Sequence, residues 1–296
     1  MTKNLTTVEL AIIGSGFGGL GAGVMALDSG IDSFLILERS DAVGGTWRDN
    51  TYPGCACDIP SHLYSFSFAQ NPDWSRSYPA QPEIEEYLER VTDDYRLRTR
   101  VRFGFDVAKI AWSDSDGYWT ITSVAGDVVF ASAVISATGP LSQPSKPNIA
   151  GLEDFRGEIF HSASWRHDVE LVGKRVGVLG TGASAIQLVP AIADSVERLV
   201  VFQRTPPWVL PRDDRPAPPL RKRLYKLLPI LQRLHRWRIY VRQEFLALAF
   251  LGKGKVARGM TARIKQETKA LIEASFPDPD VAATLLPSYR PGCKRL

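Results

Sequence analysis

The chain has 296 residues, 44% hydrophobic and 23% charged, which is a globular balance at a length that suits two ordinary domains. Three cysteines (Cys55, Cys57 and Cys293) are too few for a disulfide framework, and the lone C-x-C pair lacks the further ligands of a metal site. Without a secretory signal or an apolar stretch near the ~20 residues that span a bilayer, we expect a cytoplasmic protein. Residues 212–269 carry sixteen Lys or Arg against four Asp or Glu. The positive net charge of the whole chain, +4, therefore comes from this one segment and does not indicate a nucleic-acid partner.

The first half of the chain predicts a strand–helix–strand unit followed by antiparallel strands. A short apolar run that stops at glycine is typical of a buried parallel strand. The expected elements are a strand at 8–13, a helix at 20–29 and a strand at 33–38. Residues 108–130 alternate around Asp116-Gly117, which favours a hairpin or meander, and residues 133–137 predict another strand.

The second half repeats this unit after a linker with three prolines at 140–147. The repeat consists of a strand at 175–179, a helix at 183–193 and a strand at 199–202, and a proline-rich exit follows at 206–219. Residues 220–274 have helical periodicity. The predicted fold is α/β with two Rossmann-like dinucleotide-binding lobes, at 1–143 and 144–296, and a helical insertion at about 212–280 in the second lobe.

A glycine-rich turn follows the first predicted strand. Gly14, Gly16 and Gly19 fill the pattern G-x-G-x-x-G, which lets the backbone approach a pyrophosphate at a helix N-terminus. Glu38 ends the next strand, where an acidic residue can accept the ribose hydroxyls of an adenosine that has no 2′-phosphate. The plainer alternative is a glycine turn with a surface glutamate. We expect this lobe to bind FAD.

A second turn follows the strand at 175–179. Gly180, Gly182 and Ala185 fill G-x-G-x-x-A, and Arg204 takes the position that Glu38 has in the first unit. A guanidinium can clamp a 2′-phosphate through a bidentate pair, so this lobe is predicted to bind NADPH, unless Arg204 is only a solvated surface cation. Two dinucleotide sites on one chain suggest that electrons pass from NADPH to a flavin, which can then react with O2.

Further motifs resemble a known family. Gly44-Gly45-Thr46-Trp47, with Tyr52-Pro53-Gly54 and Asp58 after it, fits the pattern [A/G]-G-x-W-x4-[F/Y]-P-[G/M]-x3-D. Phe155, Gly157, His161 and Trp165 fit F-x-G-x3-H-x3-W, and the tail Gly292-Cys293-Lys294-Arg295 is similar to a third segment. Together they resemble type I Baeyer–Villiger monooxygenases along nearly the whole chain. The related N- or S-oxygenating flavin-containing monooxygenases stay open as an alternative.

The resemblance implies FAD, NADPH, O2 and a small organic substrate, with a flavin peroxide that inserts one oxygen into a ketone or aldehyde. By resemblance, Arg295 is the active-site cation, which could stabilise developing negative charge, and Asp58 positions it. Lys294, Arg204 and Thr205 would grip the 2′-phosphate. The predicted flavin-lining residues are Gly45, Thr46, Trp47, Tyr64 and Val107. The nicotinamide dinucleotide would be lined by Thr181, Gly182, Ala183, Ser184, Ala185, Ile186 and Gln187.

Three interpretations stay open. His161 and Trp165 fit an inter-lobe hinge, but a capped turn with a packed aromatic residue fits them equally. Leu224, Leu227, Leu228, Leu231 and Leu234 form a helical stripe that favours packing against the protein over a membrane surface. Family members continue beyond this point, so we expect C-terminal completion of the FAD lobe to be absent here, and a nucleotide-binding remnant without turnover is a further alternative. The oligomeric state is not indicated.

Overall fold

The structure is a computed structural model that describes residues 6–251 and 254–291. The chain forms two compact units, and neither is a single stretch of sequence. Unit 1 comprises Met1–Thr51 and Gln81–Arg166, and unit 2 comprises Tyr52–Ala80 and His167–Leu296. Tyr52–Ala80 belongs to unit 2 although it lies between the two segments of unit 1, so one boundary in the sequence cannot separate the units. The division into cofactor-binding lobes at 1–143 and 144–296 follows other boundaries than these two units, and it stays a prediction.

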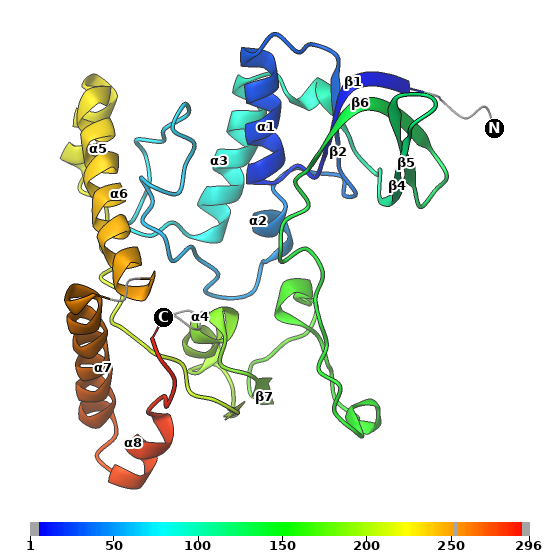
Figure 1. The fold of residues 1–296 in the computed structure, drawn as a ribbon. Coiled ribbons are helices and arrows are strands. Elements are labelled where there is room, and N and C mark those ends of the chain that lie inside the picture. Colours follow the sequence, from blue (N-terminus) through cyan, green and yellow to red (C-terminus); the bar gives the residue numbers. More distant parts are fainter. Residues whose placement is uncertain (1–5, 252–253, 292–296) are drawn as a thin grey trace. The chain divides into compact units, whose positions relative to one another are not determined.

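Unit 1 is built on a sheet of six strands in the order β3-β2-β1-β6-β5-β4 (Figure 1). The strands are β1 (Thr6–Ile13), β2 (Phe34–Leu37), β3 (Val101–Arg102), β4 (Val107–Ser113), β5 (Tyr118–Ser123) and β6 (Val128–Ser136). β1 pairs in parallel with both β2 and β6, so its apolar run lies inside the sheet, where Ala11 and Ile12 are fully buried. The mixed α/β class and the predicted first βαβ unit are confirmed.

β6 joins two kinds of pairing in one strand. Its first half pairs antiparallel with β5, while the strand as a whole runs parallel to β1. The hairpin around Asp116-Gly117 is confirmed as β4–β5. The strand expected at 133–137 is not separate: β6 runs unbroken from Val128 to Ser136, and its residues from Val129 to Ser136 pair with β1.

Three helices belong to unit 1: α1 (Phe17–Asp28), α2 (Thr46–Asp49) and α3 (Gln81–Asp94). α1 is the predicted helix after the glycine turn. α3 was not predicted, although Ile84, Leu88 and Val91 recur at helical spacing and are all buried. That periodicity was the signal available in the sequence.

Unit 2 contains the second strand–helix–strand repeat. β7 (Arg175–Leu179) and β8 (Arg198–Phe202) pair in parallel, and α4 (Ala183–Ile192) connects them, as predicted. Within the described residues this sheet has two strands, and most of their side chains are exposed. The helical insertion is confirmed as α5 (Pro219–Leu227), α6 (Pro229–Leu251), α7 (Lys255–Ser275) and α8 (Pro279–Leu285).

The leucine stripe in this insertion does not face the core of the described chain. Leu224, Leu227, Leu228, Leu231 and Leu234 are all exposed. The preference for a core-facing stripe was wrong: these leucines are exposed, and the contacts of α6 with the loop at residues 62–71 come from Gln232 and Arg236 instead. No helix in the part of the chain that the structure describes is long and apolar enough to span a membrane.

Candidate cofactor-binding sites

The first glycine turn is tightly enclosed by its own unit. Gly14 follows β1 with a positive φ of 96°, and a Cβ there would lie 2.7 Å from the carbonyl oxygen of Ala137. A Cβ on Gly19 would lie 1.8 Å from the carbonyl oxygen of Gly14, so only glycine lets α1 begin this close to the strand. Gly16 caps α1 without a side-chain hydrogen bond, which leaves amide groups of the first helical turn available to an anion.

A second glycine segment lies against this turn. Gly44 N–H donates to the carbonyl oxygen of Ser15 over 3.0 Å. Gly45 has a φ of 54°, and a Cβ on it would come within 3.0 Å of the Gly16 Cα. The motif Gly44-Gly45-Thr46-Trp47 therefore packs backbone against backbone with the predicted phosphate-binding turn. The structure brings together Gly14, Gly16, Gly19, Gly45, Thr46 and Trp47 in unit 1.

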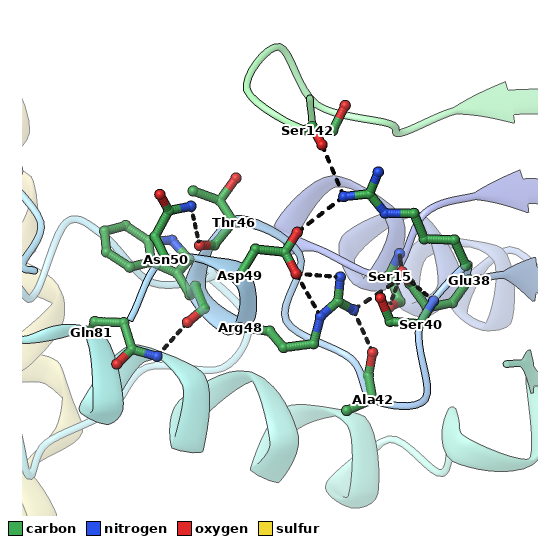
Figure 2. Close-up of polar contacts among 12 residues, drawn as sticks. Ser15, Glu38, Ser40, Ala42, Thr46, Arg48, Asp49, Asn50, Gln81 and Ser142 are labelled. Carbon is green, nitrogen blue, oxygen red and sulfur yellow. Dashed lines mark hydrogen bonds and ion pairs between the residues drawn. The ribbon is translucent and has the colours of Figure 1, made fainter. Parts of the chain in front are cut away.

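Glu38 lies buried behind the turn, and its carboxylate is held by the protein (Figure 2). Oε2 accepts the backbone N–H of Ser15 over 2.9 Å and the Ser15 hydroxyl over 2.6 Å. Oε1 accepts Ser40 N–H over 3.0 Å and lies 3.1 Å from Nη1 of Arg48. Burial raises the pKa of Glu38, but the Ser15 and Ser40 hydrogen bonds and the Arg48 charge outweigh it, so the net pKa is below 4.5.

Charged residues extend this network beyond Glu38. Arg48 Nη2 lies 2.8 Å from Oδ1 of Asp49, and Arg39 Nη2 lies 3.2 Å from Oδ2 of the same carboxylate (Figure 2). Arg39 also donates to the carbonyl oxygen of Ser142 over 2.9 Å. Sequence reasoning missed Arg39, Arg48 and Asp49, although Arg48 and Asp49 directly follow the Gly-Gly-Thr-Trp motif. A polar cavity of about 470 Å³ lies beside them, lined in part by Arg39, Asp49, Ser142 and Ser164.

The second glycine turn makes the same backbone hydrogen bond to the neighbouring strand as the first turn does, but its surroundings are open. Gly180 N–H donates to the carbonyl oxygen of Phe202 over 2.9 Å, as Gly14 N–H donates to Leu37 over 2.8 Å. Gly180 has a φ of 100°, yet a Cβ on Gly180 or Gly182 would meet no atom within 4 Å. Gly182 caps α4 without a side-chain hydrogen bond. This turn could therefore accept an anion at the α4 N-terminus from an open side.

The register corrects the position assigned to Arg204. Leu37 and Phe202 occupy equivalent places, each opposite the last residue of its partner strand. Glu38 therefore corresponds to Gln203, and Arg204 lies one residue further along. Arg204 is exposed and makes no ion pair within residues 6–251 and 254–291. Thr181 Oγ1 donates to the carbonyl oxygen of Thr205 over 3.3 Å, so the turn and the segment around Arg204 are linked.

Gln187 and Asp58 lie together in unit 2. The Gln187 side chain accepts from Tyr52 Oη over 2.9 Å and donates to the carbonyl oxygen of Ala56 over 2.8 Å. It also donates to Oδ1 of Asp58 over 3.1 Å. The amide predicted to line a dinucleotide is thus used to hold residues 52–58 on α4. Arg212 Nη1 lies 3.7 Å from Oδ1 of Asp58, and this neighbour was not foreseen.

The other predicted residues are divided among the parts of the chain. Trp47 and Val107 belong to unit 1, where Val107 packs against the sheet core, whereas Tyr64 belongs to unit 2. Lys294 and Arg295 lie outside the described residues. Among the described residues no group of three potential metal-binding side chains occurs.

The F-x-G-x3-H-x3-W segment forms a capped turn. His161 Nδ1 accepts the N–H of Ala163 over 3.0 Å, and Trp165 packs edge-on against Phe160 with ring centroids 5.1 Å apart. These contacts match the capped turn and packed aromatic residue that the sequence allowed. The hinge role of His161 and Trp165 stays a prediction.

Several known proteins are similar to this chain. Residues 11–228 match the family model described as pyridine nucleotide-disulphide oxidoreductase. A Baeyer–Villiger monooxygenase of Streptomyces coelicolor is 49% identical over 98% of this chain and 55% of its own length. A crystal structure of cyclohexanone monooxygenase from Rhodococcus sp. Phi1 bound to NADP+ has a TM-score of 0.82 and 30% identity, over 99% of this chain and 61% of that one.

A crystal structure of OTEMO in complex with FAD and NADP is similar as well. Its TM-score is 0.81 at 27% identity, and the match covers 98% of this chain and 62% of that chain. The chain thus spans about half the length of the curated relatives it matches, since a second relative from Pseudomonas aeruginosa is also covered to 54%.

Proposed function

Because the chain belongs to the pyridine nucleotide-disulphide oxidoreductase family and is a relative of the Baeyer–Villiger monooxygenases, we propose that it serves an FAD- and NADPH-dependent oxygenation of a ketone or aldehyde. One observation carries the proposal. Two glycine turns in one chain are closed by the same hydrogen bond, from Gly14 to Leu37 and from Gly180 to Phe202, and each precedes a helix without a side-chain cap. One chain therefore offers two places for a pyrophosphate.

The first turn suits FAD. Amide groups at the start of α1 would hold the pyrophosphate, and no acidic residue in the first turn of that helix would repel it. Glu38 would face the adenosine ribose. Its carboxylate already accepts four contacts, so a ribose hydroxyl would replace the Ser15 hydroxyl, which can rotate away without moving the backbone. When bound, the flavin would take hydride from the nicotinamide and activate O2 for transfer to the substrate.

The second turn suits NADPH. Amide groups at the start of α4 would hold its pyrophosphate, and the exposed Arg204 would bind the 2′-phosphate together with Thr205 and Lys294. Gln203, the counterpart of Glu38, is neutral and would not repel that phosphate. Asp58 would position Arg295, and Arg212 close to Asp58 adds a second cation beside the same carboxylate.

Cofactor content and substrate choice test the proposal together. The purified full chain is expected to retain or take up one FAD, seen as flavin absorbance, and to quench or shift NADPH fluorescence on binding. NADPH oxidation should rise when a cyclic ketone is added, with an ester or lactone as the product. A chain that binds neither nucleotide would contradict the proposal.

Other outcomes would reassign the reaction. Turnover of amines or thioethers without ketone turnover would indicate an N- or S-oxygenating flavoenzyme. Binding of NADPH without flavin uptake or turnover would leave nucleotide binding as the function of this chain. The location in a reducing compartment stays part of the proposal and rests on the three cysteines of the sequence, which are too few for a disulfide framework.

A further inference from the structure

Helix α6 contacts α5 and α7 of its own unit, and it binds the loop at residues 62–71 through polar side chains. Gln232 is buried and donates to the carbonyl oxygen of Asn71 over 2.7 Å. One turn further on, Arg236 Nη1 donates to the carbonyl oxygens of His62 and Leu63 over 2.8 and 2.9 Å. These contacts fix which side of the helix is turned toward the loop at residues 62–71. The printed contacts between this side of α6 and the loop are polar, whereas a packed helix usually makes apolar contacts.

The opposite face of α6 is apolar and exposed. Ile230, Leu234, Trp237 and Phe245 recur at the spacing of one helical face, and each is between 56% and 64% exposed. Residues that follow this pattern normally lie in a core. Here each of the four side chains is more than half exposed, so the helix has this apolar side outward.

Cations border this apolar face. Arg233 lies one turn before Trp237 on one flank, and Arg238 and Arg242 lie one turn apart on the other; all three are exposed. Residues 219–251, which span α5 and α6, carry eight Lys or Arg and one acidic residue. An apolar stripe with an aromatic residue and flanking arginines is the composition of helices that lie in the surface of an anionic bilayer.

We propose that the outward face of α6, defined by Ile230, Leu234, Trp237 and Phe245, binds the surface of an anionic lipid bilayer. The apolar side chains would enter the boundary between headgroups and acyl chains, while the flanking arginines bind phosphate groups. A second copy fits less well. In a twofold contact Arg233, Arg238 and Arg242 would meet the same cations of the other copy, and like charges repel. The inference does not depend on the proposed oxygenation.

Vesicle binding tests this proposal. The full chain is mixed with vesicles of pure phosphatidylcholine and with vesicles that also contain phosphatidylglycerol, and the bound fraction is measured by sedimentation. We expect at least tenfold tighter binding to the anionic vesicles, and a loss of this preference at high salt because the Debye length shrinks. The double variant Leu234→Ser with Trp237→Ser should bind at least tenfold more weakly. The triple variant Arg233→Gln, Arg238→Gln and Arg242→Gln should lose the preference for anionic lipid.

A matched control and three contrary outcomes complete the test. Val256→Ser changes another exposed apolar residue, on α7 of the same unit, and should leave vesicle binding unchanged. The substituted side chains are exposed, so melting temperatures should match that of the unaltered chain. Equal binding by the double variant and the unaltered chain, or no binding to anionic vesicles, overturns the proposal. A dimer in sedimentation velocity that Leu234→Ser dissolves would assign the face to a second copy instead.

Discussion

The two glycine turns share a sequence pattern and a backbone connection but differ in what surrounds them. Around the first turn, Gly14 and Gly19 are in contact with backbone atoms of unit 1, and a buried glutamate holds the segment together. Around the second, Gly180 and Gly182 face open space. The reason lies in the sheets: β1 has a strand on each side, whereas β7 has β8 alone within the described residues. The same motif is thus part of a core in one unit and an open edge in the other.

Substitution of Gly19 should give the largest difference in stability between the two turns. Gly19→Ala places a Cβ 1.8 Å from the Gly14 carbonyl, and backbone cannot move aside, so we expect a loss of about 4 kcal/mol or failure of unit 1 to fold. Denaturant unfolding, with hydrogen exchange to locate the effect, measures it. At the equivalent position Ala185 is already alanine, and Ala185→Gly should cost about 1 kcal/mol or less. Equal effects of the two changes would contradict the comparison.

Gly14→Ala and Gly180→Ala form a closer pair. Both glycines have φ near 100°, so both variants carry the strain of a left-handed alanine, about 1–2 kcal/mol. Only at Gly14 does the new Cβ also meet a carbonyl oxygen, that of Ala137, at 2.7 Å. Gly14→Ala should therefore cost about 3 kcal/mol and Gly180→Ala about 1–2 kcal/mol in denaturant unfolding. If Gly180→Ala proves the more costly, the second turn is not open.

Acidification should affect the two units in different pH ranges. In unit 2, burial and the nearby His235, Arg221 and Arg236 lower the pKa of His62 to about 3. The unfolded chain takes up this proton near pH 6.5 and the folded chain only near pH 3, so unit 2 should lose up to about 1.4 kcal/mol per pH unit between those values.

A variant that cannot titrate tests the His62 assignment. His62→Phe keeps a ring against Tyr225, which His62 contacts edge-on, and should flatten the pH dependence of unit 2 above pH 5. Hydrogen exchange between pH 7 and pH 4 follows each unit separately. An unchanged pH profile in His62→Phe would assign the acid sensitivity to other groups.

Glu38→Gln should destabilise unit 1 at neutral pH by about 2 kcal/mol, because an amide cannot accept all four contacts of the buried carboxylate. The pKa of Glu38 is lowered, so its contribution is present above pH 4.5 and disappears as the pH falls through the folded-state value. The variant and the unaltered chain should therefore converge in strongly acidic solution. Glu9→Gln, an exposed change on β1, is the control and should change stability little.

Arg204→Ala is expected to act on binding and not on stability. Loss of a charge-assisted contact to the 2′-phosphate should weaken NADPH binding about tenfold to a hundredfold and leave NADH binding unchanged. Arg198→Ala removes an exposed arginine from the other end of β8 and is the matched control. Fluorescence titration with both nucleotides measures the effect. An equal loss for NADPH and NADH would show that Arg204 does not recognise the phosphate.

Local sequence determined much of unit 1 and of the second repeat. The bounds of β7 follow from an apolar run that stops at Gly180, and α1 follows from the glycine turn before it. Such elements can be predicted because their periodicity and end signals lie within a few residues. The assignment of segments to the two units could not be predicted from such local signals. Residues 52–80 join unit 2 through contacts such as Tyr52 with Gln187, 135 residues away in the chain.

The sequence by itself determined the two glycine turns, the acidic residue behind one and the arginine beyond the other. Only the tertiary structure decided how these groups are used. It gave Glu38 four contacts from Ser15, Ser40 and Arg48, aligned it with Gln203 in place of Arg204, and turned the apolar face of α6 outward. A motif specifies backbone geometry over a few residues, whereas the partners of a side chain depend on segments brought together from distant parts of the chain.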